Sequence, residues 1–111
     1  MKGTNLGEFE ELVLLVTGVC YGEAYGVAIR DEIARQTGRS ASLSAVHAAL
    51  HRLETKGFVR SHMGGATAER GGRRKRLFDI TQAGREALET AREQRNRLWQ
   101  LIPKTAWGGA S

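Results

Sequence analysis

The clearest chemistry in this sequence lies in a short basic run, Arg70–Arg76, which consists of five cations and two glycines. Between Arg60 and Arg76, six basic residues stand against one acid, Glu69, so this segment carries a charge of +5. The whole chain also carries +5, so the positive charge is concentrated in one place. A basic loop bent by glycines indicates a polyanionic partner. DNA is the leading candidate, because neutralising its phosphates releases counterions.

Other reactive side chains are few. His47 and His51 are four residues apart and would share a helix face, but no third ligand lies at a convincing spacing, so no metal site is expected. The single Cys20 falls on an apolar stripe, where we expect a buried, inert thiol, with a redox-sensing thiol as the alternative. The chain contains no nucleophile–base–acid set, so we expect neither an enzyme nor a cofactor.

Length and composition limit the class of protein. The chain has 111 residues, of which 41% are hydrophobic and 26% charged, values typical of one soluble globular domain. No apolar run approaches the roughly 20 residues that span a bilayer. Residues 1–7 lack the apolar core of a signal peptide, so we expect no membrane association and a cytoplasmic, nucleoid-associated location.

Hydrophobic periodicity predicts the elements that must position the basic run. A first helix is expected over residues 8–21, a second over about 25–37 and a third over about 42–56. Glu8, Glu10 and Glu11 favour the dipole of the first helix. Strand-like runs at 58–63 and 74–80 flank a glycine-rich loop. Thr81 is the expected N-cap of a last helix that reaches about Leu101.

Three helices followed by a two-stranded hairpin with a basic tip make a winged helix-turn-helix. We expect a mainly α (α+β) fold with a winged-helix DNA-binding domain over 1–80, a C-terminal dimerisation helix over 81–102 and a loose tail over 103–111. A major groove about 12 Å wide accepts one helix. The third helix turns small polar residues outward, so it is the expected recognition helix, and the hairpin is the wing.

The same segments resemble the PadR-like family of transcriptional regulators. Leu43–Val59 is similar to the family's recognition-helix signature, Tyr25–Ile29 to the start of its second helix, and Glu69–Leu88 to its wing and the start of its dimerisation helix. The resemblance covers residues 6–102 and points to a short form with a single C-terminal helix. It implies a homodimeric repressor that binds double-stranded DNA and is often released by a small molecule. His47 stands where the family usually has a tyrosine.

Two groups of residues make up the expected DNA interface. The first borders base edges or phosphates from the second and third helices and comprises Tyr25, Ser42, Ser44, Ala45, His47, Ala48, His51 and Arg52. The second anchors phosphates or a minor groove from the wing and comprises Arg70, Arg73, Arg74, Lys75 and Arg76. Two roles are open for Tyr25: it contacts a phosphate at a helix N-terminus, or it is a half-buried tyrosine of the core. Two-fold symmetry predicts a palindromic operator with half-sites about one helical turn apart.

The dimer interface is expected along the first and last helices, because Leu14 and Leu15 widen the apolar stripe of the first helix beyond one core face. The expected interface residues are Phe9, Leu12, Leu15, Leu88, Ala91, Leu98, Trp99 and Ile102. Trp99 is expected to pack at the interface, and the alternative is a platform for a flat small-molecule effector there. Trp107 is expected to fold back on its own domain or on the other subunit.

The alternative function comes from a different class. A winged-helix adaptor would dock acidic protein partners through the same basic wing. Such an adaptor would lack a salt-steep, sequence-dependent affinity for duplex DNA.

Overall fold

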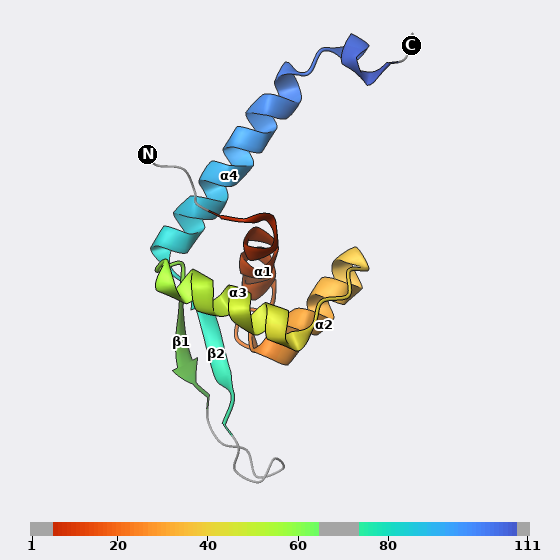
Figure 1. Cartoon of the computed structure of the whole chain (residues 1–111). Coiled ribbons are helices and arrows are strands. Elements are labelled where there is room, and N and C mark those ends of the chain that lie inside the picture. Colours follow the sequence, from red (N-terminus) through yellow and green to blue (C-terminus); the bar gives the residue numbers. More distant parts are fainter. Residues whose placement is uncertain (1–5, 65–73, 109–111) are drawn as a thin grey trace.

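The computed structural model describes residues 6–64 and 74–108, in which one long helix projects from a body made by the other elements (Figure 1). The elements are α1 (Glu8–Val19), α2 (Gly26–Thr37), α3 (Leu43–Thr55), β1 (Val59–Met63), β2 (Arg76–Ile80), α4 (Gln82–Leu101) and a short 3₁₀ helix, η2 (Lys104–Trp107). Their order and bounds agree closely with those expected from the periodicity of the sequence.

Local chemistry sets the helix boundaries. The Ser42 hydroxyl accepts a hydrogen bond of 3.0 Å from the amide of Ala45 and caps α3. The Thr81 hydroxyl accepts one of 3.1 Å from the amide of Gly84 and caps α4. Such caps satisfy amides that have no partner in the first turn. Gly38 ends α2 at a φ of +74°, a left-handed conformation that glycine adopts without steric cost.

The core lies where α1, α2 and α3 meet the hairpin. Its fully buried side chains include Val13, Leu14, Ile29, Ile33, Val46, Leu50, Leu53 and Val59. Leu14 therefore does not widen a second apolar face of α1, as its position in the sequence suggested. The reason is that α1 packs against α2, α3, β2 and α4, so its core face is broader than one helix–helix contact requires. Leu15 remains 47% exposed.

The two strands form an antiparallel hairpin in which Val59 pairs with Ile80 and Met63 with Arg76. The hairpin is also fastened to the segment before α2, because the amide of Phe78 donates to the carbonyl of Ala24 at 2.9 Å. Where the hairpin meets α4, the amide of Thr81 donates to the carbonyl of Phe58 at 3.0 Å. These two backbone bonds hold the strands against the segment before α2 and against the start of α4.

Only the first half of α4 packs on the body. Gly84, Ala87 and Ala91 are buried, whereas every residue from 92 to 108 is exposed. The chain after α4 differs from the loose tail expected, because residues 104–107 form η2 and bring the Trp107 ring to 5.4 Å from that of Trp99. Trp107 thus folds back on its own chain. None of the helices in the described part of the chain combines the length and apolar character that membrane crossing requires.

Candidate nucleic-acid interface

One face of α3 is buried and the opposite face is open. Val46, Ala49, Leu50 and Leu53 pack into the core. The exposed side contains six of the residues expected at the DNA interface: Ser42, Ser44, His47, Ala48, His51 and Arg52. Ala45, beside them, is half-buried. The helix therefore offers small and polar side chains to a large partner, and its apolar stripe holds it on the body.

The start of α2 lies directly against this helix. A Cβ atom built on Gly26 would lie 2.7 Å from both Cε1 and Nε2 of His47, so a side chain at this position would have to displace the ring. His47 is exposed, but the close approach of α2 limits where its imidazole can lie. The Gly26 position therefore helps to orient a side chain on the outer face of α3.

Three of the predicted wing cations are described by the structure, and they lie at the base of the hairpin: Arg74, Lys75 and Arg76. The Arg74 Nε donates to the carbonyl of Gly64 at 3.0 Å, and the amide of Gly64 donates to the carbonyl of Lys75 at 2.6 Å. Arg76 donates to the Ser61 hydroxyl at 2.9 Å. The guanidinium groups of Arg74 and Arg76 are on exposed side chains, as an interface with phosphates requires. Two of the expected wing residues lie outside the described residues: Arg70 and Arg73.

Tyr25 connects the wing with α3. It is the N-cap of α2 and is half-buried, and the Lys75 ammonium lies 4.1 Å from the centroid of its ring. Since Tyr25 touches Lys75 and the adjacent Gly26 lies against His47, the base of the wing and the outer face of α3 are neighbours in space.

Arg52 is engaged within the chain. Its Nε lies 2.6 Å from Oε2 of Glu10, and the Lys56 ammonium lies 2.6 Å from Oε1 of the same carboxylate. Glu10 is only 7% exposed, and this network joins α1 to the last turns of α3. Arg52 is also one of the residues predicted at the DNA interface. What its position shows is a contact with Glu10 that holds α3 against α1.

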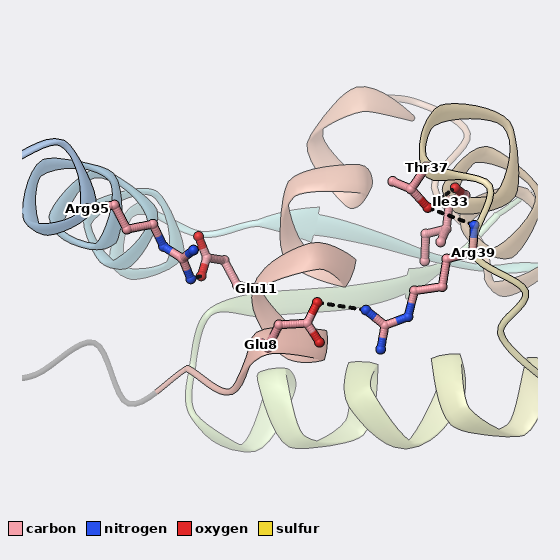
Figure 2. Close-up of polar contacts among 6 residues, drawn as sticks. All are labelled: Glu8, Glu11, Ile33, Thr37, Arg39 and Arg95. Carbon is pink, nitrogen blue, oxygen red and sulfur yellow. Dashed lines mark hydrogen bonds and ion pairs between the residues drawn. The ribbon is translucent and has the colours of Figure 1, made fainter. Parts of the chain in front are cut away.

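The first turn of α1 holds three different elements through three acids. Glu8 accepts from Arg39 in the α2–α3 connection at 2.6 Å, and Glu11 accepts from Arg95 of α4 at 2.6 Å (Figure 2). Glu10 binds Arg52 and Lys56 at the end of α3. Arg39 is further restrained because its amide donates to the Thr37 hydroxyl. From the sequence, these acids are expected only to favour the helix dipole. The partners lie 31 to 84 residues away, where no local spacing reveals them.

We expect the Glu10 network to make folding stability sensitive to acid. Burial raises the pKa of Glu10, but hydrogen bonds from Lys56, Arg52 and the Gly7 amide outweigh it and hold the pKa below its ordinary value of 4.5. Because the folded-state pKa is depressed, the stabilisation is complete above the ordinary pKa and is lost as pH falls through the folded-state pKa. Glu10→Gln should lower the free energy of unfolding at pH 7 by about 1–2 kcal/mol.

Urea unfolding at pH 7 and at pH 3 measures this effect. The difference between wild type and Glu10→Gln should shrink at the lower pH. Glu8→Gln is the matched control, because its exposed ion pair should contribute less than about 0.5 kcal/mol. An equal difference at both pH values would contradict the assignment to the Glu10 carboxylate.

The residues expected at a dimer interface fall into two groups. Phe9, Leu12 and Leu88 pack partly against the core, and Ala91 is buried within the single chain. The other four are exposed: Leu15, Leu98, Trp99 and Ile102. Leu101, which sequence analysis did not single out, is 69% exposed beside them. The far half of α4 and Ile102 thus present large apolar side chains that the described part of the chain leaves exposed.

A groove of about 440 Å³ lies between α1 and α4. Its lining residues are Glu11, Leu15, Arg85, Leu88, Glu89, Arg92 and Arg95. Trp99, for which an effector platform is the alternative to interface packing, is not among them. The described residues contain no cluster of metal-ligating side chains. Burial raises the pKa of the Cys20 thiol, so the half-buried sulfur stays protonated rather than forming a reactive thiolate.

These features define a winged-helix protein with a C-terminal helix. Residues 14–90 match the model of the transcriptional regulator PadR-like family, which is more than half of the chain. The chain therefore belongs to the PadR-like family of transcriptional regulators. None of the curated proteins compared with the chain matches it.

Solved structures share this fold. A PadR family transcriptional regulator from Eggerthella lenta is 22% identical, with a TM-score of 0.66 over 84% of this chain and 80% of that one. A PadR family regulator from Clostridium difficile is 18% identical, with a TM-score of 0.64 over 88% and 98%. Bacillus subtilis PadR, solved in complex with operator DNA, is 19% identical, with a TM-score of 0.60 over 88% and 51%.

Proposed function

We propose that this protein is a dimeric repressor that binds a palindromic operator in double-stranded DNA through α3 and the basic wing. The observation that carries the proposal is the exposed polar face of α3 beside the cationic base of the hairpin. A helix of this kind fits the major groove, and neighbouring arginines fit the adjacent phosphates or minor groove. The operator complex of Bacillus subtilis PadR, which shares the fold, supports DNA as the partner.

Ser44, Ala48 and His51 would read or border base edges, because their side chains lie on the exposed side of α3. The wing cations, including Arg70 and Arg73, would neutralise phosphates and carry little sequence information. Ser42 contributes from the helix N-terminus, where its hydroxyl also caps α3. Function then rests on binding rather than catalysis, in a cytoplasmic protein associated with the nucleoid.

A second copy of the chain is the proposed partner of α4. Leu98, Trp99, Leu101 and Ile102 are between 37% and 69% exposed, and monomeric proteins rarely leave such a cluster open. A two-fold dimer through α4 and α1 would cover these side chains and present two recognition helices. Trp99 at this interface would be the candidate contact for a flat small-molecule effector.

The deciding experiment is a titration against duplex DNA from the protein's own promoter region and an unrelated duplex of equal length, each at two salt concentrations. Tighter binding to the promoter duplex, falling steeply with salt, is the expected result. Sedimentation of the complex should give two chains per operator. Failure to bind any duplex at low salt would overturn the proposal and favour an adaptor that docks acidic proteins.

His51→Ala should change which operator sequences are preferred. A base-edge contact contributes about 1–3 kcal/mol of discrimination, so losing it should reduce the preference at one base pair about tenfold. Competition binding with single-base operator variants measures this preference. His62→Ala is the control, since His62 lies on β1 against Asp79 and should leave base preference unchanged. A uniform loss of affinity across all operator variants would argue against base reading by His51.

A further inference from the structure

Three consecutive residues, Ala24-Tyr25-Gly26, touch both elements of the proposed DNA interface. The carbonyl of Ala24 accepts from the Phe78 amide of β2 at 2.9 Å. The ring of Tyr25 holds the Lys75 ammonium 4.1 Å from its centroid, and Gly26 lies against the His47 ring of α3. This short segment therefore joins the wing to the recognition helix.

The Tyr25 ring is the rigid partner in its contact with Lys75. The backbone of Tyr25 is fixed as the N-cap of α2, and the side chain is half-buried. An ammonium over the face of an aromatic ring is attracted by the ring quadrupole. Lys75 follows the tip of the hairpin, and its carbonyl accepts from the Gly64 amide at 2.6 Å. Because Lys75 is hydrogen-bonded to Gly64 on the opposite side of the hairpin, holding Lys75 also holds Gly64 at the base of the wing.

We propose that Tyr25 is a positioning residue, whose ring face holds Lys75 and so sets the direction in which the wing leaves the body relative to α3. In this role the phenol hydroxyl makes no essential contact with phosphate. A wing held in place before binding loses less conformational freedom when it meets DNA. The inference rests on the proposed function only where its effect is measured as DNA affinity.

The contact itself can be tested without DNA. In the nuclear magnetic resonance spectrum of the free protein, the ε-methylene protons of Lys75 should be shifted upfield by the ring current of Tyr25. Tyr25→Phe should retain this shift, because the ring remains, and Tyr25→Leu should abolish it. An unshifted Lys75 signal in the wild-type protein would overturn the proposal whatever the protein does with DNA.

The consequence is tested by affinity for the promoter duplex. Tyr25→Leu should weaken binding about two- to fivefold, the range expected for an exposed cation–π contact, while Tyr25→Phe should bind as the wild type does. In a Lys75→Met background, Tyr25→Leu should have no further effect. Tyr21→Leu is the matched control, because Tyr21 is 85% exposed on the neighbouring segment and should leave affinity unchanged.

Three outcomes would overturn the positioning role. Equal losses in Tyr25→Phe and Tyr25→Leu would show that the hydroxyl matters, as in a phosphate contact. Additive losses from Tyr25→Leu and Lys75→Met would show that the two residues act independently. Tighter binding by Tyr25→Leu would show that the contact withholds Lys75 from DNA. If the wild-type protein binds no duplex, the proposed function fails, and the ring-current shift alone decides the contact.

Discussion

Gly84→Ala should lower the free energy of unfolding by about 3 kcal/mol, although alanine is the better helix former. A Cβ at this position would lie 2.2 Å from the carbonyl oxygen of Phe58 and 3.0 Å from its carbonyl carbon. Both are backbone atoms, so no side chain can rotate away. The same carbonyl accepts from the Thr81 amide, which makes the contact part of the junction that seats α4 on the hairpin.

Urea unfolding monitored by circular dichroism would measure the loss. Gly18→Ala is the matched control within α1. Its new Cβ would meet only Cδ1 of Ile80 at 3.0 Å, the end of a flexible side chain. The control should change stability by less than about 1 kcal/mol, because the gain in helix propensity offsets a small rearrangement. Equal effects of the two substitutions would contradict a backbone clash at Gly84.

Replacing Arg73, Arg74 and Arg76 together by alanine should weaken binding to every duplex about a hundredfold at low salt. The plot of log affinity against log salt concentration should flatten by about three units, since each phosphate contact contributes about 0.9. The loss should be uniform across sequences, because phosphate contacts position the protein without reading bases. Arg74 and Arg76 have the exposed side chains that this role requires.

A triple variant of equal charge separates this local effect from net charge. Arg35, Arg92 and Arg97 are exposed on α2 and α4, and their replacement by alanine should change the salt dependence little. Affinity at low salt that is unchanged by the wing substitutions would exclude the wing from the DNA interface. An equal loss in both triple variants would mean that net charge, rather than the wing, governs binding.

Much of the fold is predictable from local patterns in the sequence. The apolar spacing of α3, its Ser42 cap, Thr81 at the start of α4 and the strand runs on either side of the glycine-rich loop give element bounds within about two residues. These signals are readable because helical and extended backbones repeat over a few residues. The concentration of cations between Arg70 and Arg76 is likewise a property of the sequence alone.

Tertiary packing gives several residues a burial or a contact partner that their neighbours in the sequence do not predict. Leu14, expected to widen an outer face of α1, is buried, because α1 is covered by neighbours on several sides. Trp107, left between two possible partners, folds back on Trp99. Two roles are open for Tyr25 from the sequence, a phosphate contact or a half-buried core position, and Lys75 is expected at phosphates or a minor groove. In the structure Tyr25 is half-buried and its ring contacts Lys75.

Local sequence patterns are enough to predict the order of the helices and strands, the polar outer face of the third helix and the concentration of positive charge on the hairpin. Three features become visible once the chain is folded: Glu10 binds Arg52 and Lys56, Gly84 must lack a side chain beneath Phe58, and the Tyr25 ring holds Lys75. The reason is physical: hydrophobic period and capping act between near neighbours in the chain. Contacts between residues tens of positions apart depend on how the helices and the hairpin pack against one another.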